Sequence, residues 1–176
     1  MGMLEQLILF LLIKRELTMY GIQKAISDAF SAYTKPSFGA IKPALKRLEA
    51  DGFIRSRRAM SDGGKQSGFY SITNEGLQEL KRLLMENLSE NPIQFFSNAR
   101  IKLSCASFLS NEECEKLFAN LKLRAMEHKF SAENTLNDEY TPLTFYQRVV
   151  LDNTLCEYQN LISLIENLEK ENARNS

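Results

Sequence analysis

The side chains of this chain that could do chemistry are mostly basic, and they concentrate in one segment. Residues 35–65 contain eight Lys or Arg and three Asp or Glu, a net charge of +5, whereas the 176-residue chain has a formal net charge of +0. Lysine and arginine neutralise phosphate oxygens, and these contacts supply much of the affinity of proteins for nucleic acids. A basic segment on a neutral chain therefore predicts a nucleic-acid-binding surface.

The chain lacks the residue patterns that enzymes and metalloproteins commonly use. Its one histidine, His128, has no cysteine or carboxylate partner at a fixed spacing, and Cys105, Cys114 and Cys156 are too far apart for a metal site. No phosphate-binding loop, dinucleotide fingerprint or nucleophile elbow is present. We therefore predict no enzyme activity, no catalytic residue, no metal and no cofactor. The cysteines are interpreted as reduced cytosolic thiols, with redox sensing as a minority hypothesis.

Apolar spacing predicts three helices in the first part of the chain. Residues 3–15 carry apolar side chains along one helical face, and Thr18 is the expected cap of a second helix. Ser37 is the expected cap of a third helix, which ends at Gly52 because glycine accepts the left-handed conformation after a helix. Pro43 leaves two interpretations open: the helix begins near residue 42, or its first turns are kinked.

A hairpin and a further helix follow. Residues 53–58 and 69–73 are short extended runs on either side of the glycine-rich turn 61–65, which predicts a β-hairpin. Thr73 is the expected cap of a helix that continues to about residue 87. Three helices followed by a hairpin outline a winged helix-turn-helix domain, with the third helix as the recognition helix and the hairpin as the wing.

The outward face of the third helix is the predicted DNA-reading surface. Ile41, Leu45 and Leu48 face the core, so small and basic residues remain on the opposite face, where they can approach base edges and phosphates. The wing adds basic side chains that can hold the DNA backbone. The predicted DNA-contacting residues are Ser37, Gly39, Ala40, Lys42, Lys46, Arg47, Arg57, Lys65 and Tyr70.

The chain beyond Pro92 is predicted to be helical and to join two copies of the protein. Ser110 and Glu113 form a capping box that opens one helix, and a long final helix begins near Pro142. Apolar residues of this final helix repeat at intervals of three and four, which predicts a dimerisation surface. The predicted dimerisation residues are Leu151, Leu155, Tyr158, Ile162 and Ile165.

These elements predict a mainly α protein with two domains. The N-terminal domain, residues 1–88, is expected to be a winged helix-turn-helix domain with a two-stranded β-wing. The C-terminal domain, residues 92–176, is expected to be a helical dimerisation domain.

Three motifs in a fixed order connect the chain with a known family. They are residues 20–22 (YGI), residues 43–54 (PALKRLEADGFI) and residues 69–76 (FYSITNEG). They resemble the start of the second helix, the recognition-helix signature and the strand-to-helix signature of the PadR-like transcriptional regulators. Order and spacing match over residues 3–85. The remainder resembles, by its length and pattern, the helical C-terminal domain of the longer, virulence-activator-type branch of that family.

The resemblance implies a homodimer that binds an inverted repeat of double-stranded DNA. Repression by blocking a promoter is the simplest mechanism, and a small-molecule effector of unknown identity is a further hypothesis. Lys42 stands where the family often has an aromatic residue, and Ala40 where it often has Ser or Thr, so the DNA sequence that is read can differ. Lys65 and Gln66 replace an arginine-rich wing tip, which favours contact with the DNA backbone over insertion into the minor groove.

The leading hypothesis is thus a cytoplasmic, dimeric, DNA-binding regulator without a membrane partner. The apolar run at residues 7–13 is far shorter than a membrane span and lacks the flanking features of a signal peptide. The alternative class is a winged-helix adaptor that binds protein and not DNA. A continuous basic surface formed by Lys42, Lys46, Arg47 and Arg57 would favour DNA, whereas acidic side chains interleaved with them would favour the adaptor.

Overall fold

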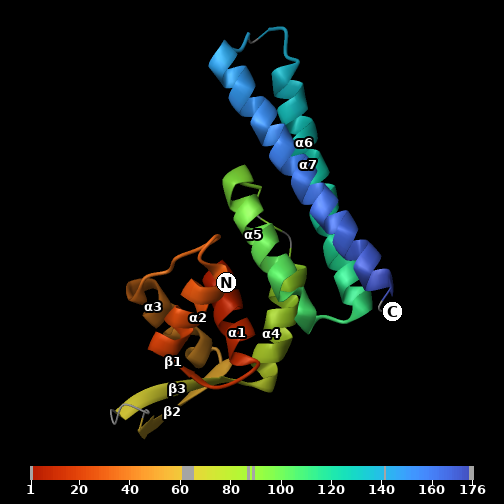
Figure 1. Ribbon diagram of the computed structural model, residues 1–176. Coiled ribbons are helices and arrows are strands. Elements are labelled where there is room, and N and C mark those ends of the chain that lie inside the picture. Colours follow the sequence, from red (N-terminus) through yellow and green to blue (C-terminus); the bar gives the residue numbers. More distant parts are fainter. Residues whose placement is uncertain (1, 61–65, 87, 89, 141, 175–176) are drawn as a thin grey trace. The chain divides into compact units, whose positions relative to one another are not determined.

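The computed structural model describes residues 2–60, 66–86, 88, 90–140 and 142–174. The chain forms two compact units: Met1–Glu86 with Ile93–Phe108, and Asn87–Pro92 with Leu109–Ser176. Figure 1 shows a mainly helical architecture with a small sheet, which confirms the predicted fold class. The domain boundaries at 88 and 92 stay a prediction, and residues 93–108 pack with the first unit.

The first unit combines short helices with a small antiparallel sheet. In chain order its elements are α1 (Met3–Leu12), β1 (Leu17–Thr18), α2 (Met19–Phe30), α3 (Phe38–Ala50), β2 (Ile54–Met60), β3 (Gln66–Ile72), α4 (Asn74–Met85), most of α5 (Pro92–Cys105), and a 3₁₀ turn over Ala106–Phe108. Helices α2 and α3 form the helix-turn-helix, and β2 and β3 form the wing.

The sheet has one strand more than the sequence predicted. Strands β2 and β3 pair antiparallel from Ile54↔Ile72 to Met60↔Gln66, which confirms the hairpin, while its turn at residues 61–65 lies outside the described residues. Strand β1 pairs with β3 on the other side, giving the order β1-β3-β2. In the sequence, Leu17 lies between two predicted helices and outside any predicted strand. A strand of two residues is too short to show the alternation that predicts strands.

The predicted helix starts are confirmed by the hydrogen bonds of their caps. The side-chain oxygens of Thr18, Ser37 and Thr73 each accept a hydrogen bond from the backbone N–H three residues further on, at 3.1, 3.3 and 3.0 Å. Such bonds satisfy N–H groups that have no partner within the helix. Helix α3 therefore begins at Phe38 and contains Pro43, so the alternative start near residue 42 is wrong.

Two glycines shape the junction between α3, the sheet and α4. Gly52 follows α3 with a φ of 77°, in the left-handed region, as its position after the helix predicted. Gly76 lies in the first turn of α4, where a Cβ would overlap the carbonyl oxygen of Phe53. The hydroxyl of Thr73 also donates to the carbonyl of Gly52 at 2.7 Å, so the start of α4 is joined directly to the end of α3.

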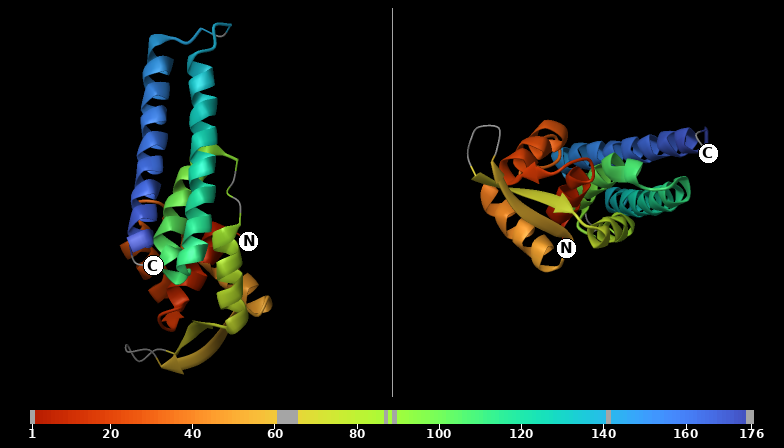
Figure 2. Two further views of the ribbon diagram at one scale, coloured as in Figure 1. Left: turned by 90° about the vertical axis from the view of Figure 1, so that its right-hand side faces the viewer. Right: turned by 90° about the horizontal axis from the view of Figure 1, so that it is seen from below.

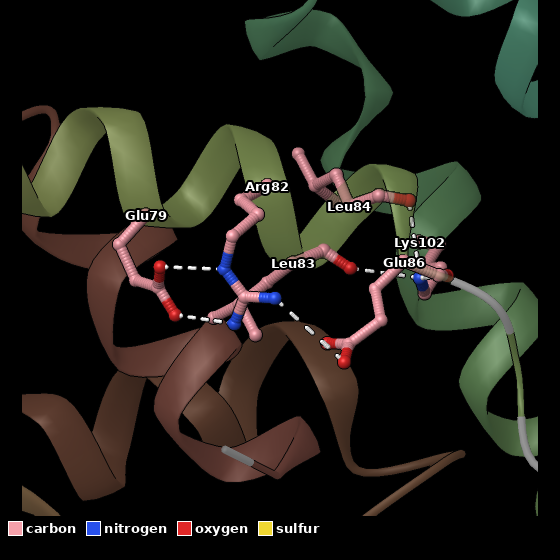
Figure 3. A network of polar contacts seen from close by, with 6 residues as sticks. All are labelled: Glu79, Arg82, Leu83, Leu84, Glu86 and Lys102. Carbon is pink, nitrogen blue, oxygen red and sulfur yellow. Dashed lines mark hydrogen bonds and ion pairs between the residues drawn. The ribbon is translucent and has the colours of Figure 1, made fainter.

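A buried lysine joins α5 to the end of α4 (Figure 3). The Nζ of Lys102 donates to the backbone carbonyls of Leu83 at 2.8 Å, Leu84 at 3.1 Å and Glu86 at 2.5 Å. The last carbonyls of a helix have no partner within the helix, and a cationic donor also interacts favourably with the negative end of the helix dipole. Burial lowers the pKa of Lys102 to about 8, and the charge of Glu86 acts in the opposite direction.

The second unit is a pair of long helices, α6 (Asn111–Leu136) and α7 (Phe145–Arg174), which lie side by side in Figure 2. The predicted capping box is confirmed, because Ser110 accepts from the backbone N–H of Glu113 and the Glu113 carboxylate accepts from that of Ser110. The predicted final helix begins at Phe145, somewhat after Pro142. Within the described part of the chain, no helix is long and apolar enough to cross a membrane.

Candidate nucleic-acid interface

Helix α3 divides into a buried face and an exposed face, as its sequence predicted. Ile41 and Leu48 are fully buried and Leu45 is nearly so, which orients the helix on the core. The opposite face is solvent-exposed and includes Ser37, Gly39, Ala40, Lys42 and Lys46. Lys42 and Lys46 are one turn apart, and neither has a hydrogen-bond or ion-pair partner among the described residues. Their ammonium groups are therefore available to an anionic ligand.

Arg47, one residue further along α3, is held by α1. Its guanidinium donates from Nε to Oε1 of Glu5 at 3.1 Å and makes an ion pair with the same oxygen through Nη2. Glu5 is only 4% exposed, and its other carboxylate oxygen accepts from the backbone N–H of Gly2 at 3.1 Å. A buried carboxylate needs a compensating cation, so Arg47 positions α3 against α1 in this structure. Its predicted role in DNA contact stays a prediction.

Arg57, on the wing, is also paired with a carboxylate. Its Nε and Nη2 donate to Oε2 of Glu16 at 2.8 and 2.5 Å, and its Cζ lies 5.2 Å from the centre of the Phe69 ring. Phe69 faces Arg57 across the β2–β3 ladder. The hydrogen bond from Arg57 is the main reason why the pKa of Glu16 is lowered from its ordinary value, so Glu16 is ionised at neutral pH. The Arg57 charge is thus largely neutralised by its own chain.

The base of the wing is bonded to the last turn of α3. Ser56 donates to Glu49 at 2.5 Å, and Tyr70 is the cross-strand partner of Ser56. Tyr70 is half-buried, and burial followed by the Glu49 charge raises its pKa, so its hydroxyl remains protonated. Arg55 donates to the hydroxyl of Ser71 at 3.1 Å. The contacts fix the wing relative to the recognition helix.

The predicted interface residues are therefore only partly brought together. Those on the exposed face of α3 share one surface, whereas Arg47 and Arg57 are held by carboxylates and Tyr70 by its packing. Arg58 is exposed on β2. Lys65 lies outside the described residues, so its place in the wing stays a prediction.

The predicted dimerisation residues have unequal positions in α7. Tyr158, Ile162 and Ile165 are buried within the chain, and the Tyr158 ring stacks on His128 of α6 with centroids 5.8 Å apart. Leu151 and Leu155 are half-buried. The periodicity of these five residues is thus explained to a large extent by the packing of α7 on α6, and their role between two chains stays a prediction.

The cysteines differ in accessibility. Burial raises the pKa of the Cys105 thiol to about 12, and burial also raises that of Cys114. Cys156 is exposed on α7. Among the described residues, no group of three or more His, Cys, Asp or Glu is placed to hold a metal ion.

Comparison with known proteins finds a family that is similar to the N-terminal part of the chain. Residues 8–82, which include the helix-turn-helix and the wing, match the model of the transcriptional regulator PadR-like family. The winged helix-turn-helix part of the chain thus matches the PadR-like family of transcriptional regulators. The negative transcriptional regulator PadR of Bacillus subtilis (strain 168) is 27% identical over 177 residues, which are 96% of this chain and 96% of that protein.

Solved structures of PadR-like proteins are also similar to the chain. The crystal structure of Bacillus subtilis PadR in complex with operator DNA is 24% identical, covers 97% of this chain and 99% of that chain, and has a TM-score of 0.45. A PadR family transcription regulator of Clostridium difficile R20291 is 30% identical over 46% of this chain and 82% of that chain, with a TM-score of 0.42.

The sequence interpretation missed residues that shape this surface. Phe38 lies three residues before Ile41, so its spacing assigns it to the buried apolar stripe of α3. In the structure Phe38 is the first residue of the helix, and it is exposed. Glu5 and Glu16 are more than 40 residues away from Arg47 and Arg57. No local pattern signals such pairs, because only the folded chain brings them together.

Proposed function

We propose that the chain is a sequence-specific regulator that binds double-stranded DNA through α3. The observation that carries the proposal is the exposed face of α3, where Lys42 and Lys46 extend beside the small residues Gly39 and Ala40. Small residues let a helix approach the groove closely, and cations on the same face can reach phosphates and base edges. The matched family model, which spans this helix, supports a role in transcription.

The proposed active form is a homodimer on an inverted repeat. Several large apolar side chains of α7 are exposed in the single chain, among them Tyr146 at 80% and Val150 at 67%. A surface hollow of about 380 Å³ lies among Tyr146, Gln147, Val150, Leu151 and Thr154. A second copy would cover this apolar surface together with Leu151 and Leu155. Two symmetric recognition helices then require two symmetric half-sites.

Repression is the proposed mode of regulation. The Bacillus subtilis relative, which matches almost the whole chain, is named as a negative transcriptional regulator. A dimer bound across a promoter would exclude the transcription machinery from it. We place this activity in the cytoplasm, where the DNA of such regulators lies.

A small-molecule effector is a further part of the proposal. A hollow of about 340 Å³ in the first unit is lined by Phe10, Leu11, Lys14, Ala29, Phe30 and Ser104. Small-molecule sites commonly have volumes of about 300–1,000 Å³ and apolar linings with few polar groups. The hollow supports an effector site of that size without identifying the effector.

The decisive experiment is fluorescence anisotropy with DNA from upstream of the gene that encodes the chain. A random duplex of equal length, measured at two salt concentrations, is the control. We expect salt-sensitive binding to the upstream DNA that is at least about 10³-fold tighter than binding to the control. Absence of binding to either duplex at low salt would contradict the proposal.

The adaptor is a second candidate, because two of the four basic residues that define the DNA surface are neutralised. Glu5 pairs with Arg47 and Glu16 with Arg57, so acidic side chains do interleave with the basic ones. The same titration separates the two functions, since an adaptor would bind neither duplex. If both duplexes bound equally weakly, the titration would be repeated with other candidate operators and with added effectors.

A further inference from the structure

An exposed aromatic pair lies at the start of the recognition helix. Tyr20 is the second residue of α2 and Phe38 the first residue of α3, and their rings stack with centroids 6.4 Å apart and planes inclined by 18°. Tyr20 is 66% exposed and Phe38 is 41% exposed. Neither ring belongs to the buried core, so much of their apolar surface is in contact with water.

Phe38 is in line with the free cations of α3. Residues 38, 42 and 46 follow one another at intervals of four and lie on one side of a helix. The exposed face of α3 thus presents an apolar ring at its N-terminal end, followed by the ammonium groups of Lys42 and Lys46. Ser37 caps the helix at this end, which fixes the backbone that carries the ring.

The chemistry of this row matches one feature of the DNA major groove. N-terminal residues of a recognition helix contact base edges. A phenyl ring neither donates nor accepts a conventional hydrogen bond, so it distinguishes bases by apolar contact, and thymine presents a methyl group in the major groove. The stack on Tyr20 restricts the Phe38 ring before binding, which lowers the entropy that the contact would otherwise cost.

We infer that Phe38 is a specificity-determining residue that contacts the 5-methyl group of a thymine in each half-site, and that Tyr20 is its positioning residue. This inference rests on the proposed DNA-binding function. It places Lys42 and Lys46 beyond the thymine, where they contact phosphates or base edges.

The test removes the methyl group alone. A duplex is first enriched from a randomised pool with the unmodified protein. Each thymine of one half-site is then replaced by deoxyuridine, and dissociation constants are measured by anisotropy at constant salt. At one position we expect binding to weaken by about fourfold, the effect of burying one methylene-sized group. Phe38→Ala is expected to bind more weakly and to show no difference between thymine and deoxyuridine at that position.

Further variants separate contact from positioning and from folding. Tyr20→Phe keeps the stack and is expected to keep the thymine preference, whereas Tyr20→Ala is expected to reduce it. Phe38→Leu keeps apolar bulk and is expected to retain part of the preference, which guards against a folding defect in Phe38→Ala. Tyr140→Ala removes an exposed ring from the other unit and serves as the matched control. Circular dichroism melting checks the fold of each variant.

Distinct results would overturn the inference and the proposed function. The inference would be overturned if replacing thymine by deoxyuridine left the affinity unchanged at every position. It would also be overturned if the loss of affinity persisted in Phe38→Ala. Either result would leave DNA binding itself intact. If the Phe38 ring contacted deoxyribose and not the methyl group, replacing thymine by deoxyuridine would leave the affinity unchanged. An enriched half-site without thymine would overturn it as well. Failure to enrich any duplex, seen before a base is replaced, would contradict the proposed function and the inference together.

Discussion

Arg57 and Glu16 form an ion pair in which two guanidinium N–H groups, Nε and Nη2, donate to one carboxylate oxygen. The pair lies beside the Phe69 ring and joins the wing to the segment before β1. A phosphate that approaches Arg57 meets a cation whose charge is already offset by a neighbouring carboxylate. We therefore expect this arrangement to reduce the contribution of the wing to the proposed DNA binding.

Glu16→Gln is therefore expected to strengthen DNA binding. Removal of the carboxylate restores a full positive charge at Arg57, so the plot of log affinity against log salt should become steeper by about 0.9, the value for one additional phosphate contact. Glu139→Gln changes the net charge equally at an exposed position of the other unit and is the control. Anisotropy over a salt series measures both slopes. Identical slopes for the two variants would contradict the expectation, and so would weaker binding of Glu16→Gln.

Neighbouring substitutions on α3 are expected to act differently. Lys46→Ala should weaken DNA binding and reduce the salt slope by about 0.9, while the melting temperature stays the same. Arg47→Ala leaves the buried Glu5 without its cation and should lower the free energy of unfolding by about 1–3 kcal/mol. Urea titration and anisotropy of both variants test this contrast. A stable Arg47→Ala protein with a reduced salt slope would assign Arg47 to DNA instead.

The proposed dimer surface on α7 can be tested by comparing substitutions at exposed and at buried positions of this helix. Val150→Asp places a charge on the exposed apolar surface and should convert dimers to monomers in light scattering without loss of helix. Asn160→Asp adds the same charge at an exposed polar position of the helix and should leave the dimer intact. Ile162 is only 7% exposed within the chain, so Ile162→Asp should instead destabilise the α6–α7 pair. A dimeric Val150→Asp protein would argue against this surface.

Lys102 is expected to stabilise the first unit. Lys102→Met leaves the carbonyls at the end of α4 without their donor and should lower the free energy of unfolding by about 1–3 kcal/mol at neutral pH. Lys116→Met removes a lysine that is paired with Glu112 on the surface, and it should change the free energy of unfolding much less, because exposed ion pairs contribute little. Denaturant titration compares the two variants. Equal stabilities would contradict a structural role for Lys102.

The contribution of Lys102 should also depend on pH. Its pKa is about 8 in the folded protein, below the ordinary 10.5, so between these values the unfolded state binds more protons. The free energy of unfolding of the unmodified protein should therefore rise with pH relative to that of Lys102→Met across this window. The ion pair with Glu112 raises the pKa of Lys116, so the contribution of Lys116 persists to about pH 10.5 and falls above it. Lys116→Met should consequently run parallel to the unmodified protein between pH 8 and 10.5.

Cys156 is expected to be the reactive thiol of the native protein. It is exposed, whereas Cys105 and Cys114 are buried and their pKa values are raised, which lowers their thiolate fraction. Brief treatment with N-ethylmaleimide, followed by peptide mass spectrometry, should modify Cys156 first and the other two only after unfolding. Cys156→Ser should show no fast phase. Equally rapid modification of Cys105 would show that its helix opens readily.

Local interactions explain what the sequence by itself determined about this protein. The caps at Thr18, Ser37 and Thr73 and the left-handed Gly52 depend on residues within a few positions, so their types and spacing predicted them correctly. The spacing of the apolar residues in α3 predicted its buried stripe. The same spacing also predicted the exposed face that carries Lys42. Three motifs of short range predicted the match of residues 8–82 to the PadR-like family.

Tertiary structure alone decided which of the basic residues remain available. Arg47 and Arg57 have the same chemistry as the free lysines, but Glu5 and Glu16 reach them only after the chain has folded. The same holds for Lys102, which the sequence does not distinguish from a surface residue and which is buried because α5 packs on the end of α4. It also holds for β1, which forms because it pairs with the edge of β3. Tyr158 and Ile165 have the spacing of an interface, and the fold uses them first to join α7 to α6. Sequence spacing predicts which face of a helix is apolar, whereas the partner of that face depends on contacts between residues that are distant in the chain.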